Sequence, residues 1–283
     1  MIRSKSAHLY LLPGMAGLLV FHIIPLLYGV RFVFSSNSYP RVNIGLQAVS
    51  NLVKNPLFWL SLRNIFFFFA ACIPTVVVLS FSLACFLKNF GKLGTACGIG
   101  FFMPYALPVS ATAPISLILL APNGVAGNAL HQLWGVPLSL LTSGALRWVI
   151  VMLYLWRNTG FIALVFSAAI QSVPSEYYEH ALLEGAGPIR QHARITAPLL
   201  AHTFVFAFFI AFMNNMKIYK EIFALSGSYP DEAIYTVQHF INNLFLKMNY
   251  NSLSAASYIL LFMLAVIFGL AFALDKRISN GGM

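Results

Sequence analysis

Six long apolar segments, separated by more polar connections, dominate the pattern of this chain. A helix needs about 20 mostly apolar residues to cross a bilayer, and a continuous segment in lipid must satisfy its own backbone hydrogen bonds. The pattern therefore predicts an all-α, polytopic membrane protein with about six transmembrane helices. The predicted spans are residues 9–34, 65–87, 99–120, 147–170, 199–216 and 253–274.

The composition agrees with lipid as the main solvent. The chain has 283 residues, of which 59% are hydrophobic and 8% charged, whereas soluble domains carry about 25% charged residues. The net charge of +10 would suggest nucleic acid in a soluble protein. Basic loops beside membrane helices are instead attracted to anionic headgroups, so we expect contact with the lipid bilayer and none with nucleic acid.

The N-terminus resembles a signal peptide, because Arg3 and Lys5 precede an apolar segment. No small-residue cleavage site follows, and the apolar run to Phe34 is too long for the core of a signal. We therefore expect a retained first span. Lysine and arginine are slightly denser in the connections that lie inside when the N-terminus is cytoplasmic, which favours cytoplasmic N- and C-termini.

No chemistry-bearing cluster is evident in the sequence. Cys72, Cys85 and Cys97 form no CxxC pair, and no cluster of histidines lies near them, so neither a disulfide framework nor a zinc site is indicated. The chain has no phosphate-binding loop motif. No nucleophile, histidine and carboxylate come together. We predict no catalytic, metal or cofactor site.

One strongly polar, helix-forming segment, residues 172–198, lies between the fourth and fifth predicted spans. Ser175 is a plausible N-cap, and Glu176 in the first turn favours the helix dipole. The helix should run to about Glu184, where Gly185 allows a backbone turn that other residues resist.

A second short helix should follow this turn. Gly187 and Pro188 suit the cap and the first position of a helix. Pro198 should end it, because proline disfavours helix at the preceding residue. The segment is thus predicted to be a helix–glycine–helix unit between two spans.

Two interpretations of this unit remain open from the residues alone. Short interfacial helices on a lipid surface are common. Here, however, three glutamates precede two arginines, and the small residues Ala181, Gly185 and Ala186 cluster. Small residues permit close backbone approach, which suits insertion into a cleft on a partner protein.

The same segment resembles the "EAA" loop of permease subunits in binding-protein-dependent ABC importers. That pattern is Glu-Ala-Ala, three residues, Gly, about nine residues, Ile, two residues and Pro. Departures are His180 for the middle alanine, Glu184 for the usual aspartate and His192 where phenylalanine is frequent. The positions that match are Glu179, Ala181, Gly185, Ile195 and Pro198.

The resemblance covers nearly the whole chain and is greatest to the carbohydrate-uptake type, as in maltose and glycerol-phosphate importers. Two departures are Ser116-Leu-Ile-Leu-Leu, in place of a Trp-rich end to span three, and Gly227-Ser-Tyr-Pro, in place of Gly-Gly-Pro. The matching stretches include Leu11-Leu-Pro, Pro104-Tyr-Ala-Leu-Pro, Gly124-Val-Ala-Gly-Asn, Trp156-Arg-Asn-Thr-Gly-Phe and Ala168-Ala-Ile-Gln-Ser.

The resemblance implies a single permease domain over residues 1–283, of the type I ABC importer fold, in the bacterial inner membrane. Residues 172–198 would be a cytoplasmic coupling-helix loop docked on an ATPase dimer that binds and hydrolyses the ATP. A second permease subunit, giving a heterodimer, and an extracytoplasmic solute-binding protein are the further partners. The solute would be a sugar or sugar-like, with glycerol phosphate as one candidate. The implied coupling residues are Glu179, Ala181, Glu184, Gly185, Ala186, Ile195 and Pro198.

Four polar residues in or near the predicted spans are candidates for the solute path. Arg157 and Asn158 lie about ten residues into the fourth span, and Asn214 and Asn215 end the fifth. A charge inside a span usually faces the bundle interior or water. A structural hydrogen bond, snorkelling or a helix cap is the alternative explanation for the same residues.

Other classes of protein compete with the importer subunit. A standalone secondary transporter or channel should carry charged relay residues in several spans, and only Arg157 lies well inside one. An intramembrane enzyme needs a convergent polar site, which the sequence does not indicate.

Overall fold

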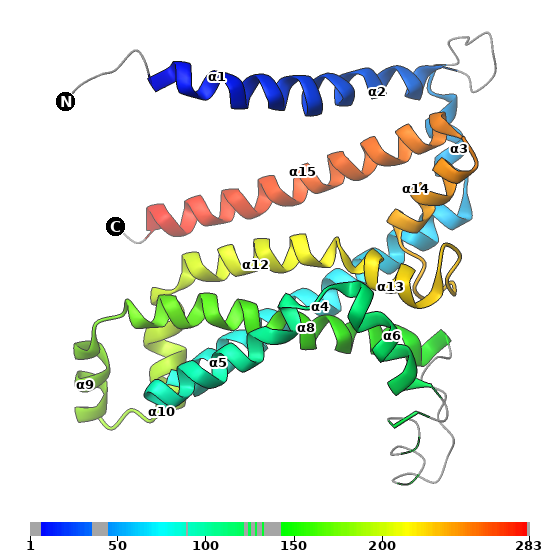
Figure 1. Cartoon of the computed structure of the whole chain (residues 1–283). Coiled ribbons are helices and arrows are strands. Elements are labelled where there is room, and N and C mark those ends of the chain that lie inside the picture. Colours follow the sequence, from blue (N-terminus) through cyan, green and yellow to red (C-terminus); the bar gives the residue numbers. More distant parts are fainter. Residues whose placement is uncertain are drawn as a thin grey trace. The chain divides into compact units, whose positions relative to one another are not determined.

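The computed structural model describes residues 7–35, 45–88, 90–121, 124–125, 128, 132 and 143–281 (Figure 1). The regular secondary structure of these residues is helical, as predicted. Arg3, Lys5 and part of the match at residues 124–128 lie outside the described residues. In chain order the elements are α1 (Ala7–Leu18), the π-helix η1 (Leu19–Ile23), α2 (Ile24–Phe34), α3 (Gln47–Val53), α4 (Pro56–Lys88), α5 (Gly91–Ala106), α6 (Val109–Leu120), α8 (Ser143–Gln171), α9 (Ser175–Leu183), α10 (Pro188–Gln191), the π-helix η2 (His192–Thr196), α11 (Ala197–Leu199), α12 (Ala201–Asn215), α13 (Ile218–Ser226), α14 (Val237–Leu246) and α15 (Tyr250–Gly281).

The prediction of about six spans is confirmed. Five helical stretches of the described chain are long and apolar enough to cross a membrane, and one bent pair of helices makes a sixth candidate. The five are Tyr10–Phe34, Pro56–Lys88, Gly144–Gln171, Ala201–Ser226 and Tyr250–Ala273.

The second span begins nine residues earlier than predicted, at Pro56 instead of residue 65. Pro40, Gly45 and Pro56 favour a mixed connection over residues 35–64 in the sequence. Asn64 is instead fully buried, where its Nδ2 donates to the Tyr235 carbonyl at 2.9 Å. Arg147 Nη2 in turn donates to Asn64 Oδ1 at 2.8 Å. Polar groups whose hydrogen bonds are made inside the protein need no water. The apolar helix therefore tolerates Asn64 within it.

The third span, predicted over residues 99–120, is broken in the structure. Its two halves, α5 and α6, meet at a bend of 93°. Leu107 takes an extended conformation, as expected before Pro108, which also lacks the N–H needed to continue the helix. Pro74, Pro104 and Pro114 lie inside helices instead.

The described chain divides into two compact units. The first comprises Met1–Trp59 and Phe240–Ile267, and the second comprises Leu60–His239 and Phe268–Met283. In the first unit, Tyr258 donates its hydroxyl hydrogen to the Leu26 carbonyl. Apolar side chains of α1, η1 and α2 remain exposed there, including Tyr10 of α1 at 85% and Phe21 of η1 at 76%, which suits contact with lipid.

The second unit contains all the residues that the sequence singled out as candidate sites. Its core includes the fully buried rings of Phe68 and Phe166. Helices α5 and α8 approach closely at Gly160, where a Cβ atom would lie 1.8 Å from the Phe101 carbonyl oxygen, so only glycine fits. Within this unit, α9 and α6 lie at opposite ends (Figure 1), with α8 running between them.

Candidate functional site

The polar segment between the fourth and fifth spans forms the predicted helix–glycine–helix unit. The predicted N-cap of its first helix is wrong. Helix α9 begins at Ser175, so this serine is the first helical residue and makes no capping bond. The cap position falls on Pro174, which is held in an extended conformation (φ −57°, ψ 138°). Glu176 lies in the first turn, as predicted.

The turn at Gly185 is confirmed and has a defined geometry. Gly185 has φ +76°, in the left-handed region that glycine favours. Its N–H donates to the Leu182 carbonyl at 2.9 Å, and the Ala186 N–H donates to the Ala181 carbonyl at 2.9 Å. These two bonds constitute a Schellman motif, which ends the helix and satisfies its last carbonyls.

The second short helix begins as predicted, with Gly187 as cap and Pro188 in the first turn of α10. The prediction that it ends by Pro198 is wrong. The chain continues through η2 and α11 and breaks only at Leu200. Pro198 is tolerated because it occupies the first turn of α11, where a backbone N–H need not be satisfied within that helix.

Beneath α9, a cluster of side chains ties it to the rest of the second unit. The Tyr178 hydroxyl lies 3.0 Å from Thr196 Oγ1, and His192 Nδ1 lies 3.2 Å from the same oxygen. Lys88, at the end of α4, places its Nζ 3.4 Å from the centre of the Tyr178 ring. Burial, aided by the charge of Lys88, lowers the pKa of His192. The neutral imidazole is therefore favoured in this cluster.

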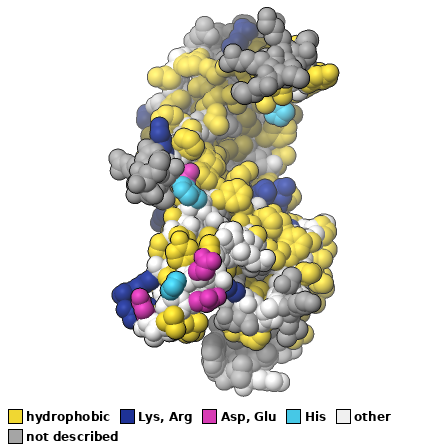
Figure 2. All heavy atoms as spheres, turned by 90° about the vertical axis from the view of Figure 1, so that its left-hand side faces the viewer, with side chains coloured by type: hydrophobic (Ala, Val, Ile, Leu, Met, Phe, Trp, Pro, Cys, Tyr) yellow, Lys and Arg dark blue, Asp and Glu magenta, His cyan; other side chains and the backbone are white. Residues whose placement is uncertain are grey.

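The other face of α9 and α10 is exposed and mixes apolar with charged side chains. Leu183 and Ile189 are each 86% exposed. Figure 2 looks onto this side, where acidic side chains gather with basic ones beside them. Exposed large apolar residues beside charges are typical of interaction surfaces. The exposed residues of the helix–glycine–helix segment include Glu176, Glu179, Leu182, Leu183, Glu184, Ile189, Arg190 and Arg194.

The predicted coupling residues divide between the two faces. Glu179, Glu184 and Gly185 are exposed, as is Pro198. Ala181 is buried, so its small size serves packing within this chain. The remaining two, Ala186 and Ile195, are half-buried.

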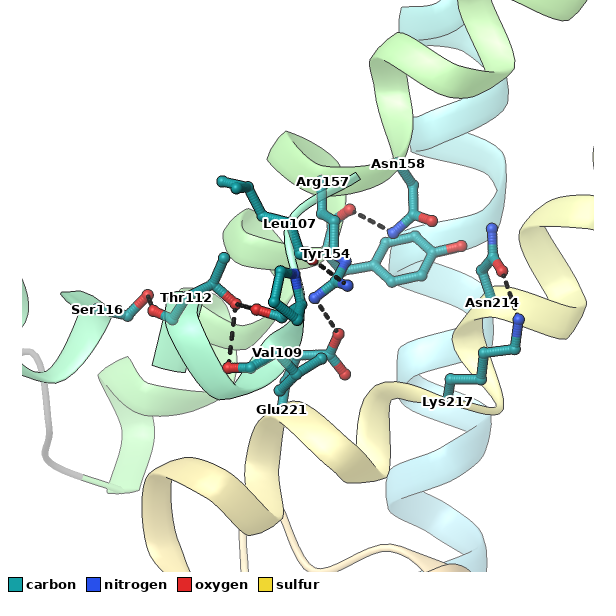
Figure 3. A network of polar contacts seen from close by, with 11 residues as sticks. Leu107, Val109, Thr112, Ser116, Tyr154, Arg157, Asn158, Asn214, Lys217 and Glu221 are labelled. Carbon is teal, nitrogen blue, oxygen red and sulfur yellow. Dashed lines mark hydrogen bonds and ion pairs between the residues drawn. The ribbon is translucent and has the colours of Figure 1, made fainter. Parts of the chain in front are cut away.

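A second polar cluster lies inside the predicted membrane region, around Arg157 (Figure 3). Arg157 is at the middle of α8, well inside a span, as the sequence indicated. Its Nη1 lies 3.2 Å from Glu221 Oε1, and its Nη2 donates to the Leu107 carbonyl at 2.8 Å. The guanidinium thereby joins α8 to α13 and to the break between α5 and α6.

Glu221 is the residue of this cluster that the sequence reasoning missed. Residues 217–252 lie between the fifth and sixth predicted spans, in a connection that contains Gly227, Pro230, Asp231 and Glu232. Ile218 and Ile222 are buried on α13, and their spacing of four residues was the available signal of an amphipathic helix.

The three asparagines proposed for the path lie in different surroundings. Asn158 is buried and donates to the Tyr154 carbonyl at 2.8 Å. Asn215 is fully buried and donates to the Phe68 carbonyl at 3.3 Å. Asn214 Oδ1 accepts a bond from Lys217 Nζ at 3.2 Å. Of the three asparagines, only Asn214 is partly exposed.

A small cleft of about 20 Å³ opens beside the ion pair. Helices α6, α8 and α13 supply its walls. Such a volume holds one water or one hydroxyl group. Its lining residues are Thr112, Ala113, Ser116, Leu153, Trp156, Arg157, Glu221 and Leu225.

The fold and the polar segment together define a multi-pass helical membrane protein. Solved chains of a bacterial ABC transporter for import of the acidic polysaccharide alginate share the fold. One has a TM-score of 0.85 at 23% identity, covering 97% of this chain and 96% of that chain.

Residues 49–280 match the family described as the inner membrane component of binding-protein-dependent transport systems. The chain belongs to this family and is accordingly a multi-pass inner membrane protein. Among its relatives, the lactose transport system permease protein LacF of Rhizobium radiobacter is 25% identical, over 93% of this chain and 92% of the relative. The trehalose/maltose transport system permease protein MalF of Thermococcus litoralis is also 25% identical, over 95% and 92%. A probable ABC transporter permease protein of Mycoplasma genitalium is 27% identical, over 93% and 82%.

Proposed function

We propose that this chain is a membrane-spanning subunit of an ATP-driven importer and forms part of the path for a sugar or sugar-like solute. Membership of the transport family supports the role, and the names of relatives that carry lactose and trehalose or maltose support the solute class. Glycerol phosphate is a further candidate. No residue is assigned to catalysis, and ATP is bound by a partner.

The observation that carries the proposal is the two-faced structure of α9. Its inner face is held by the Tyr178 cluster, while Leu183 and Glu179 on the outer side are exposed to a partner. A short helix fixed on one side and free on the other can pass movement from a docked protein to α4 and η2. Differential binding to two states of that partner then supplies the coupling free energy.

In this proposal the partner docked at α9 is a dimer of ATP-binding cassette ATPases. The seven residues predicted from the sequence remain assigned to coupling, the buried Ala181 through its packing within this chain. Leu183 and Ile189 are added because of their exposure. The N- and C-termini then lie in the cytoplasm with residues 172–198. A second permease subunit and an extracytoplasmic solute-binding protein complete the importer.

The solute path is assigned to the polar groups of the second unit. Arg157 and Asn214 have side chains that are only partly buried and are the more accessible candidates. Asn158 and Asn215 line the same region of α8 and α12 from buried positions. We propose that these two asparagines hold the helices that shape the path.

Copurification tests the coupling role. The chain, extracted in mild detergent, should bring an ATPase subunit with it, whereas a standalone secondary transporter or channel should not. Leu183→Asp should release that ATPase, because it places a charge in an apolar contact. Leu246→Asp, at a comparably exposed leucine of α14 (57% exposed), is the matched control and should retain it. Absence of any ATPase from the wild-type preparation contradicts the proposal.

Orientation is tested separately by labelling a single cysteine. Glu184→Cys, in a chain without its natural cysteines, should react with a membrane-impermeant maleimide only after the inner face is opened. Labelling from the outer face would overturn the assignment of residues 172–198 to the cytoplasm.

A further inference from the structure

The charge of Arg157 is already compensated within this chain. Its Nη1 pairs with Glu221 Oε1 at 3.2 Å, and the two side chains are only 18% and 21% exposed. Its Nη2 is used by the Leu107 carbonyl at 2.8 Å. An anionic solute that approached Arg157 would meet the Glu221 carboxylate at the same place.

Glu221 retains unused acceptor capacity. Its Oε2 atom is buried and has no hydrogen-bond partner among the described residues. A carboxylate oxygen can accept about two hydrogen bonds and donates none when ionised. The group that satisfies it must therefore bring a hydrogen, as a hydroxyl does and a carboxylate or phosphate dianion does not.

The cleft beside the pair has the size and walls for such a group. Its volume of about 20 Å³ suits a single hydroxyl. Thr112 and Ser116 line it with hydroxyl oxygens whose hydrogens already go to backbone carbonyls on α6 or its N-terminal end, so they too present acceptors. Trp156, 51% exposed, adds an aromatic surface at the rim. Figure 3 shows Glu221 beside Arg157, with Thr112 and then Ser116 farther to the left along α6.

We propose that Glu221 is a specificity-determining residue: paired with Arg157, it makes this part of the path select hydroxyl-rich neutral solutes over their acidic counterparts. The inference rests on the proposed function and refines it, since it disfavours glycerol phosphate. Two like charges about 4 Å apart repel by several kcal/mol at the effective dielectric of protein surfaces. The net charge of +10 therefore does not predict which solute charge this part of the path prefers.

The test uses the purified importer complex in lipid nanodiscs, with binding followed by thermal shift. The probes are two matched pairs, trehalose with trehalose 6-phosphate and glucose with glucuronate. Wild type should bind the neutral member of each pair about tenfold more tightly. Glu221→Gln frees the Arg157 charge and should reverse that preference.

Two further variants separate specificity from folding. Glu232→Gln, a change of the same type at an exposed glutamate, should keep the wild-type ratio. Arg157→Gln with Glu221→Gln removes both charges and should restore the preference for the neutral probes, because no uncompensated charge remains.

The proposal is overturned if Glu221→Gln keeps the wild-type ratio, or if wild type binds the acidic probe more tightly or binds none of the probes. These outcomes differ from failure of the proposed function, which would show as a complex without an ATPase.

Discussion

The α9 segment and the Arg157 cluster both place charges in a chain that is mostly apolar, but they use these charges differently. Around α9 the carboxylates of Glu179 and Glu184 are exposed. Around Arg157 the charges are largely buried and paired with each other at 3.2 Å. The first arrangement leaves charges available to another surface, whereas the second uses them inside the fold.

The surroundings explain this difference. A buried, unpaired charge is costly, so Arg157 requires Glu221 and the Leu107 carbonyl nearby. The glutamates of α9 are solvated and cost little where they lie, which makes them free to recognise a partner. In this membrane protein, exposed charges are therefore available for contact with a partner, whereas buried charges hold the helices of the chain together.

Gly185→Pro should abolish solute uptake while leaving membrane insertion intact. Proline requires φ near −65°, whereas Gly185 has φ +76° and donates its N–H to Leu182. The exit of α9 must then rearrange. Uptake by cells and the amount of protein in the membrane fraction are the measurements. Gly187→Ala, where φ is −69° and a Cβ meets no atom within 4 Å, is the control and should transport normally.

Arg157→Gln alone should lower the free energy of unfolding by up to about 3 kcal/mol, because it leaves Glu221 buried without its cation. The double variant Arg157→Gln, Glu221→Gln should recover most of this loss. Thermal unfolding in detergent measures both. If the double variant is no more stable than the single one, the pair does not constrain the fold as described.

Acid should destabilise the chain through His239, a fully buried histidine of α14. Burial lowers the pKa of this histidine from 6.5 to about 4. Stability is thus fully present above pH 6.5 and falls as the pH drops toward 4, because only the unfolded chain takes up the proton readily. The full loss is on the order of 3 kcal/mol. His239→Gln should flatten the pH profile of thermal unfolding over this range, and an unchanged profile would contradict the assignment.

Tyr178→Phe should have the smallest effect on stability, about 1 kcal/mol, because it removes one hydrogen bond to Thr196 and keeps the ring beneath Lys88. Its informative readout is the amount of solute moved per ATP hydrolysed, which should fall while ATPase binding persists. Tyr178→Leu, which also removes the cation–π contact, should lower that ratio further. If wild type and both variants move the same amount of solute per ATP, the movement of the ATPase is transmitted without this tyrosine.

The sequence predicted local features of the α9 segment well because glycine and proline act through their own backbone. Gly185, Gly187 and Pro188 do what their conformational preferences require. The errors at Ser175 and Pro198 concern where a helix begins or ends, and neighbouring residues decide that. The exposure of Leu183 could not be read from the sequence, since it depends on which face of α9 packs inward.

The Arg157 cluster was less predictable because its partners come from distant segments. Arg157 itself was evident as a charge in an apolar segment, but Leu107 and Glu221 lie 50 and 64 positions away. Pro108 breaks a helix while Pro74, Pro104 and Pro114 do not, and proline content alone cannot rank them. At the site that bends, the Leu107 carbonyl accepts a hydrogen bond from Arg157, a contact between distant segments.

The π-helix η2, from His192 to Thr196, contains an extra residue a short distance before α12. A π turn accommodates one residue more than an α turn. Deleting one residue there should let the turn close as α-helix and leave the spans beyond it in register. The same deletion within α12 would rotate the downstream residues by about 100° and turn Phe212 out of the core.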